Sequence, residues 1–198
     1  MDKFQIKGAP TCRVVYVDGL FEKRQVNGIE GDPKYNAIII VPKNDKEKID
    51  QINAAFAEAF KDLQSKGCKV KNVAGLNPKN VCWSDGDIHA EQTENPAFAG
   101  YMLLKVASKN FRPLVVDMQK RIITNGFPLS TPVSEENISP EMLGSGDYVF
   151  ANVSFWTYTA KAQGIGCNIH AIMRVKEGER IGGMSHNVDD YIEIQGYE

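Results

Sequence analysis

Residues Asp147 to Lys176, with the sequence DYVFANVSFWTYTAKAQGIGCNIHAIMRVK, carry the longest strand pattern of the chain. Two segments of this stretch, Asp147–Thr159 and Gly166–Val175, are rich in valine, isoleucine and aromatic residues, which predicts two long β-strands. The connector between them contains Lys161 and Gly164 and is short enough for the strands to pair as a hairpin. The side chains of these two strands therefore decide what each face of the hairpin presents.

Successive side chains of a strand point to opposite faces, and the two sets differ in chemistry here. One set is mostly apolar and predicts a face toward the core: Val149, Ala151, Val153, Phe155 and Thr157, with Cys167, Ile169, Ala171, Met173 and Val175. The other set mixes aromatic rings with polar and basic groups: Tyr148, Phe150, Asn152, Ser154, Trp156 and Tyr158, with Asn168, His170, Ile172, Arg174 and Lys176.

A face that carries both rings and bases suits single-stranded nucleic acid. Rings stack on bases of any sequence, at roughly 1–3 kcal/mol per base, and cations neutralise the phosphates. Tyr101, Lys105 and Lys109, on or just after a further predicted strand, extend the same surface. The alternative is a two-sided core, in which another element covers the aromatic side.

The rest of the chain predicts a mainly β protein with one substantial helix and long loops. The helix is expected over Asn44–Gly67, where apolar residues recur every three or four positions. The segment Cys68–Pro96 is rich in glycine, asparagine and aspartate and is expected to be irregular, with at most a short strand near Val81. Further strands are expected over Thr11–Asp18, Tyr35–Val41, Tyr101–Ser108 and Pro113–Asp117. Short strands with a capping helix indicate a small β-barrel or a sandwich.

The charge is unevenly distributed along the chain. The net charge of the 198 residues is −2. Asn187–Glu198 carries four acidic residues and no basic one, so residues 1–186 keep a net charge of +2. The segment from Tyr101 to Ser134 has five basic residues against Asp117 alone. A basic body with an acidic end is compatible with a phosphate-binding surface.

The common catalytic motifs are missing from the sequence. It has no G-x-x-x-x-G-K-[ST] phosphate loop, no H-E-x-x-H and no G-x-S-x-G. We therefore expect no enzyme, no catalytic residue, no metal and no cofactor. A metal-dependent nuclease that uses Asp85, Asp87 and His89 is a minor alternative. The four cysteines form no C-x-x-C pair and are expected to be reduced thiols. The longest apolar run is Ala37–Val41, so no membrane span is expected, and the N-terminus does not read as a secretory signal.

The order of several short motifs resembles a family of bacteriophage single-stranded DNA-binding proteins, and it is more distantly similar to those of phages that encode a small replisome. The motifs, in chain order, are Lys34–Tyr35, Val41–Lys43, Asn95–Tyr101 (NPAFAGY), Arg112–Asp117 (RPLVVD), Gly144–Tyr148 (GSGDY), Gly164–Gly166 (GIG) and Ile181–Gly183 (IGG). The resemblance covers roughly residues 10–185. It implies an OB-fold, a five-stranded barrel that binds oligonucleotides.

The resemblance also implies a setting and partners. The expected setting is phage DNA replication, recombination or repair in the cytoplasm of the infected bacterial host. The expected domains are a single OB-fold-like DNA-binding domain over residues 1–186 and a short acidic end over 187–198. The expected partners are single-stranded DNA, further copies of the chain on DNA, and replisome proteins that contact the acidic end.

These observations give one prediction of function and one alternative. The prediction is a sequence-tolerant single-stranded DNA-binding protein. Its stacking residues are expected to be Trp83, Tyr101, Tyr148, Phe150, Trp156 and Tyr158. Its phosphate contacts are expected to be Lys105, Lys109, Arg112, Lys161, Arg174 and Lys176. The alternative is a phage structural or assembly protein that self-associates through the aromatic face.

Overall fold

Ten β-strands and two α-helices make up the part of the chain that the computed structural model describes, residues 4–6, 11–25, 32–124, 127–128, 143–160 and 162–181. The strands are β1 (Phe4–Ile6), β2 (Arg13–Val15), β3 (Tyr35–Pro42), β4 (Trp83–Asp85), β5 (Tyr101–Ser108), β6 (Leu114–Val116), β7 (Ile123–Thr124), β8 (Phe127–Pro128), β9 (Tyr148–Tyr158) and β10 (Gly164–Lys176). The helices are α1 (Lys46–Ser65) and α2 (Gly86–Thr93), with 3₁₀ turns η1 (Val17–Leu20), η2 (Val73–Gly75), η3 (Pro78–Asn80) and η4 (Pro96–Phe98).

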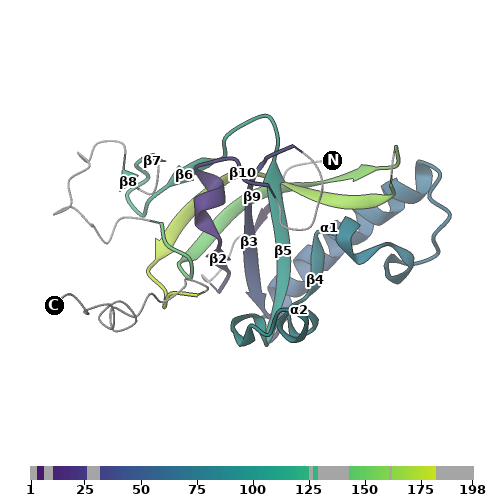
Figure 1. Ribbon diagram of the computed structural model, residues 1–198, viewed down its shortest axis with the longest axis horizontal. Coiled ribbons are helices and arrows are strands. Elements are labelled where there is room, and N and C mark those ends of the chain that lie inside the picture. Colours follow the sequence, from purple (N-terminus) through teal and green to yellow (C-terminus); the bar gives the residue numbers. More distant parts are fainter. Residues whose placement is uncertain are drawn as a thin grey trace, which may run out of the picture.

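Five of these strands close into a barrel. The pairing runs β2–β3–β5–β10–β9 and returns to β2, with β10 parallel to β5 and the other pairs antiparallel. β1 continues the line of β2 along β9, and β6 continues the line of β5 along β10. A closed five-stranded barrel with this crossover is an OB-fold, which confirms the expected fold class. Figure 1 shows the β9–β10 hairpin along the length of the molecule, with β3 and β5 running across it.

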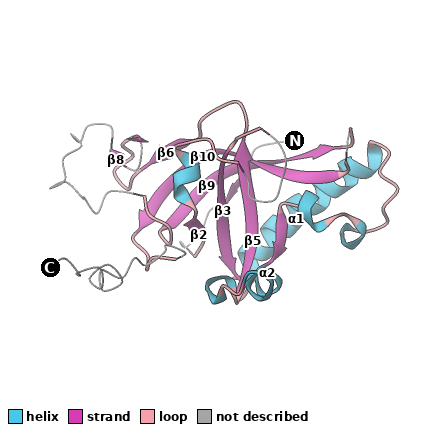
Figure 2. Cartoon of the chain, in the orientation of Figure 1, coloured by secondary structure: helices cyan, strands magenta, loops and turns pink. Residues whose placement is uncertain are grey.

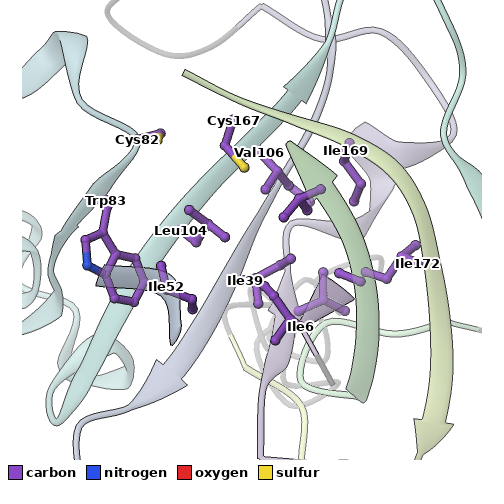
Figure 3. Close-up of a cluster of buried hydrophobic side chains, with 14 of the residues drawn as sticks. Ile6, Ile39, Ile52, Cys82, Trp83, Leu104, Val106, Cys167, Ile169 and Ile172 are labelled. Carbon is purple, nitrogen blue, oxygen red and sulfur yellow. The ribbon is translucent and has the colours of Figure 1, made fainter. Parts of the chain in front are cut away.

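The apolar side of the hairpin forms the barrel interior, as its pattern predicted. Val149, Ala151, Val153 and Phe155 of β9 are all buried in the main core. Figure 3 shows that core, in which side chains from β3, β5 and β10 meet Ile52 of α1. Burial of this apolar surface is the main favourable term in folding.

The alternation along β10 breaks at a β-bulge, which corrects the predicted faces of its second half. The register steps from Ile169 opposite Val153 to Ala171 opposite Asn152, so His170 is an extra residue. Ile172 and Arg174 therefore turn inward and are buried, whereas Ala171 and Met173 move to the outer face. A second irregularity between Arg174 and Lys176 returns Lys176 to the outer face.

Helix α1 covers one end of the barrel, as the sequence predicted for a long amphipathic helix. Asp45 caps its first turn, where a side-chain oxygen accepts a hydrogen bond from the Lys48 N–H. Its apolar stripe packs into the core, and the ring of Phe56 meets Phe155 edge-on at 5.6 Å between centroids. In Figure 2 the helix lies beside the tip of the β9–β10 hairpin. Within the described ranges, no helix is long and apolar enough to cross a membrane.

The segment expected to be irregular, Cys68–Pro96, contains β4 and α2. β4 pairs with β5, and Asp85 then caps α2 by accepting a hydrogen bond from the Asp87 N–H. At the start of α2, a Cβ on Gly86 would lie 2.4 Å from the carbonyl oxygens of Phe98 and Tyr101, so only glycine fits there. With η4, α2 covers part of the outer side of β3 and β5 over a small cluster of Val15, Ile40, Phe98 and Leu103.

Candidate nucleic-acid interface

The tip of the β9–β10 hairpin carries an exposed tryptophan that rests on a glycine. Trp156 is 41 % exposed and lies opposite Gly166 in the register. A Cβ on Gly166 would lie 2.5–2.7 Å from three atoms of the indole, so the ring lies broadside over the glycine backbone. One face of the ring is therefore held against the sheet, and the other is left for a stacking partner.

Tyr158 extends this aromatic surface toward the connector. Its ring lies 5.0 Å from that of Trp156 between centroids, and the hydroxyl end of Tyr158 lies against Gly164, where a Cβ would be 2.4 Å from the phenol oxygen. The Tyr158 hydroxyl donates to the carbonyl of Asn80 at 3.3 Å, and burial raises the pKa of this phenol above its usual value. The tyrosine is therefore anchored by its hydroxyl while part of its ring stays accessible.

The hairpin tip is continuous with the outward side of β3 and β5, which we call the β3–β5 face (Asn36, Ile38, Lys105 and Ala107). Ile38 lies opposite Lys105, and Ala107 lies opposite Asn168 of β10. Lys105 is half-buried on this face, and Cys82 lies between it and Ile165, joined to both by backbone hydrogen bonds. Lys105, a predicted phosphate contact, and Trp156, a predicted stacking residue, therefore lie on one continuous surface.

Tyr148 and Lys176 lie together at the other end of the hairpin. The guanidinium of Arg13 and the ammonium of Lys176 lie over the Tyr148 ring, at 5.2 and 5.6 Å from its centroid. Arg13 is itself held by the carbonyls of Gly146 and Glu179. The ring of Tyr148 therefore supports cations in this structure, and Lys176 is exposed beside it.

Phe150 belongs to an apolar row rather than to the aromatic tip. Phe150 of β9 lies opposite Met173 of β10, and Met173 lies opposite Val116 of β6. Val116 forms an isolated β-bridge with Ile122. Ile122 is 46 % exposed, and the neighbouring Leu114 and Met118 are also exposed. We call Phe150, Met173, Val116 and Ile122 the apolar row.

Two of the predicted site residues are buried, and these predictions were wrong. Trp83 points into the core and donates its indole N–H to Asn53 of α1 at 2.9 Å, so its ring is not offered to a base. Arg174 is 1 % exposed, because the bulge at His170 turned it inward, and its Nε lies 2.9 Å from a carboxylate oxygen of Asp147. Both side chains are therefore buried rather than offered at the surface.

The remaining predicted residues are scattered. Tyr101 packs on the small outer cluster under α2. Lys109 is exposed but pairs with Asp32 at 2.5 Å, and exposed Arg112 donates to the carbonyl of Phe21. Lys161 lies outside the described residues, as does the acidic segment 187–198.

Asp85 and Asp87, the carboxylates of the alternative nuclease prediction, both form ion pairs with Lys43. The ammonium of Lys43 lies 2.6 Å from a carboxylate oxygen of Asp85 and 2.5 Å from one of Asp87. The hydrogen bond from Lys43 lowers the pKa of Asp87, and Gly100 adds a backbone hydrogen bond to the same carboxylate. This cation sits where a metal ion would have to bind, and the described residues contain no group of three metal-ligating side chains.

Sequence reasoning missed two residues on this surface. Gly166 could have been found, because a hairpin that joins Tyr158 to Gly164 also places Trp156 opposite Gly166. Tyr16 was assigned to the first strand, but it follows β2 in a left-handed conformation with φ 59° and is 45 % exposed. No residue pattern near Tyr16 signals that conformation.

Comparison with known proteins places the chain in a family. A family model described as the ssDNA-binding protein of Enterobacter phage Enc34 matches residues 6–197. The chain belongs to this family. Protein p50 of Acyrthosiphon pisum secondary endosymbiont phage 1 is 28 % identical over 182 residues, which cover 88 % of this chain and 86 % of that protein.

Solved structures share the fold of this Enc34-family chain. The single-stranded DNA-binding protein from bacteriophage Enc34, in complex with ssDNA, matches with a TM-score of 0.67 and 19 % identity, over 91 % of this chain and 89 % of that one. The single-stranded DNA-binding protein gp2.5 encoded by bacteriophage T7 matches with a TM-score of 0.56 and 12 % identity, over 100 % and 98 % of the two chains. The predicted family resemblance is thus confirmed.

Proposed function

We propose that this Enc34-family protein binds single-stranded DNA with little sequence preference and catalyses no reaction. The observation that carries the proposal is the Trp156 ring, which has one face on Gly166 and the other exposed at the tip of the hairpin. Family membership supports the ligand, since a relative of the same fold has been solved in complex with ssDNA. In an OB-fold, oligonucleotides bind across the second and third barrel strands and the adjoining loops, which correspond here to the β3–β5 face and the hairpin tip.

The proposed mechanism combines stacking with neutralisation of phosphates. A base stacks on the free face of Trp156 and contacts Tyr158, while Lys105 neutralises a phosphate as the strand crosses the β3–β5 face. Lys176, Lys109 and Arg112 are exposed enough to add charge at the margins, and Lys161 stays a predicted contact. Because the protein would bind unpaired DNA better than duplex, binding would shift hairpins toward the open strand.

A fluorescence titration tests the stacking step. In the Trp83→Phe protein only Trp156 reports, since the chain has two tryptophans. We expect strong quenching of the Trp156 emission by an oligothymidine of fifteen residues and weaker quenching by a duplex of equal length. Part of the quenching by the oligothymidine should remain at high salt. Trp156→Ala should weaken binding of a labelled oligothymidine roughly tenfold or more. Absence of quenching together with equal, salt-labile binding of both DNAs would refute stacking.

A second titration tests the role of Lys105. Lys105→Met should reduce the slope of log affinity against log salt by about 0.7, the value for one phosphate contact on a single strand. Lys46→Met is the matched control, because Lys46 is an exposed lysine on α1, away from this surface. An unchanged slope for Lys105→Met would remove this residue from the interface.

We further propose that the protein acts in phage DNA replication, recombination or repair in the cytoplasm of the infected host. The acidic residues of 187–198 are proposed to compete with DNA for the basic surface and to contact replisome proteins. Truncation before Asn187 should then tighten binding of single-stranded DNA at low salt. Equal affinity of the full-length and truncated proteins would reject the competition.

Self-association is a second candidate function, and the apolar row favours it. The row spans β9, β10 and β6 and ends in exposed Ile122, which is unusual for a surface without a partner. Sedimentation of the DNA-free protein should show concentration-dependent association that Ile122→Glu abolishes. A monomer at all concentrations would leave DNA binding as the single proposal.

A further inference from the structure

Tyr16 has an exposed ring that its own backbone turns outward. Val14 points into the barrel core and Val15 points to the outer cluster, so regular alternation would send Tyr16 back into the core. The left-handed conformation of Tyr16, φ 59° and ψ 44°, prevents this and leaves the ring 45 % exposed. Among the tyrosines that the structure describes, it alone is exposed.

The surrounding structure holds this turn in place. The Tyr16 N–H donates to the hydroxyl of Ser145 at 3.0 Å, and the Tyr16 carbonyl accepts from the Gly19 N–H at 3.2 Å. Residues other than glycine rarely adopt positive φ, and such conformations persist where neighbours enforce them, often at functional sites. A glycine or asparagine would fit the backbone better, so the presence of a large ring calls for an explanation.

The ring continues the β3–β5 face toward β2. It lies 6.2 Å from the Phe98 ring between centroids, at 32°, and Phe98 lies 4.9 Å from His89. Burial lowers the pKa of His89, and the positive charge of Lys105 lowers the pKa of this histidine further, which places Lys105 near it. The register gives the same path, because Val15 lies opposite Ile38 and Ile38 lies opposite Lys105.

We propose that Tyr16 is a second base-stacking platform, which binds a base of the same strand that stacks on Trp156. This inference rests on the proposed DNA binding and assigns a contact to the end of the bound DNA strand that lies away from Trp156. The path along the sheet from Tyr16 to Trp156 starts at β2 and crosses β3, β5, the backbone of Cys82 and β10 before it reaches β9. Neighbouring strands are about 4.8 Å apart, so the two rings are on the order of 20 Å apart along this path. In Figure 1 the end of β2 and the hairpin tip lie on opposite sides of β3 and β5. One strand would stack at both ends and contact Lys105 between them.

The test compares variants of Tyr16 on long and short oligonucleotides. Tyr16→Asn removes the ring and suits the left-handed backbone, and Tyr16→Phe keeps the ring and removes the hydroxyl. With a labelled oligothymidine of fifteen residues, Tyr16→Asn should bind at least about fivefold more weakly, and Tyr16→Phe should bind like the unmodified protein. With oligothymidine of three residues, too short to reach both rings, the loss for Tyr16→Asn should shrink. Thermal melts should show that both variants are folded.

The outcomes separate this inference from the proposed function. If Trp156→Ala weakens binding and folded Tyr16→Asn does not, the second platform is refuted and DNA binding at the hairpin stands. If Tyr16→Phe loses as much affinity as Tyr16→Asn, the hydroxyl acts rather than the ring, and stacking on Tyr16 is refuted. If neither Trp156→Ala nor Tyr16→Asn weakens binding, stacking fails at both ends and the proposed mechanism fails with it.

Discussion

Trp156 depends on Gly166 for its position, and this dependence can be tested. Any side chain at Gly166 would bring a Cβ to within 2.5 Å of the indole, so Gly166→Ala must displace the ring. We expect Gly166→Ala to weaken binding of oligothymidine by about fivefold, part of the value of one stacked base. The emission of Trp156 in the Trp83→Phe protein should shift at the same time.

The control for this prediction is a double-mutant cycle. If Gly166 acts through the ring, Gly166→Ala should cost no further affinity once Trp156 is alanine. Gly75→Ala is a matched replacement outside the β9–β10 hairpin, at a glycine whose Cβ would also meet a neighbouring side chain, that of Val70. Equal losses from Gly166→Ala in the presence and absence of the Trp156 ring would contradict the idea.

Arg174 has a structural role, and its replacement should cost stability rather than DNA affinity. It is buried against Asp147, which is also buried and accepts hydrogen bonds from the backbone of Gly144 and Gly178. Arg174→Met leaves that carboxylate without its buried partner and should lower the free energy of unfolding by about 3–5 kcal/mol. Denaturant unfolding measures this loss.

Arg180 provides the comparison, because it pairs with the same Asp147 from the surface. Its side chain is 56 % exposed, and exposed ion pairs contribute about 0–1 kcal/mol. Arg180→Met should therefore be much milder than Arg174→Met. If Arg174→Met unfolded at the same denaturant concentration as the unmodified protein but had a reduced salt slope for DNA, our assignment of Arg174 would be reversed.

Among the elements, α1 depends on a cap that also ties it to the N-terminal strand region. Asp45 accepts a hydrogen bond from the Lys48 N–H, and the hydroxyl of Thr11 donates to its other oxygen. Asp45→Ala should lower the free energy of unfolding by about 0.5–2 kcal/mol, as loss of an N-cap usually does. Asp50→Ala, at an exposed position within α1, is the control and should be nearly neutral. Equal unfolding curves for Asp45→Ala and the unmodified protein would show that the cap contributes nothing.

Elements with a regular apolar pattern could be predicted from the sequence, and elements without one could not. The long strands and α1 were predictable, because their apolar residues repeat with the period of the structure they form. The bulge at His170 was not, because one extra residue in a strand needs no special residue type, yet it moved Arg174 from the surface to the interior. α2 was missed because it is short and is fixed by Lys43 and by the close approach at Gly86 rather than by an apolar stripe.

For the whole molecule, the candidate site is assembled from strands far apart in sequence. Trp156 and Lys105 come from β9 and β5, and closure of the barrel brings their strands onto one surface. The sequence indicated the kinds of residue that form the surface. It could not show that Trp83 turns inward, because a three-residue strand has too few positions to define its faces. Three-dimensional closure therefore decided which aromatic residues are accessible.

The cysteines offer a test of the closed barrel as a whole. All four are buried without disulfides, and Cys82 and Cys167 lie in the core shown in Figure 3. Burial raises the pKa of the Cys82 thiol to about 12 and that of Cys12 to about 11, so almost none of these two thiols is present as reactive thiolate near pH 8. In the native protein we expect a disulfide reagent such as Ellman's to react very slowly, at a rate set by opening of the structure.

The same reaction in denaturant supplies the control for this test. Unfolding should expose all four thiols and give four equivalents at once. DNA should slow the native reaction further if it binds only the folded barrel, because a ligand of the native state reduces the population that opens. Rapid native reaction of even one thiol would mean that the structure opens locally at that cysteine. Cys82 would be the most informative site, because it lies between Lys105 and Ile165, where the β3–β5 face meets the hairpin.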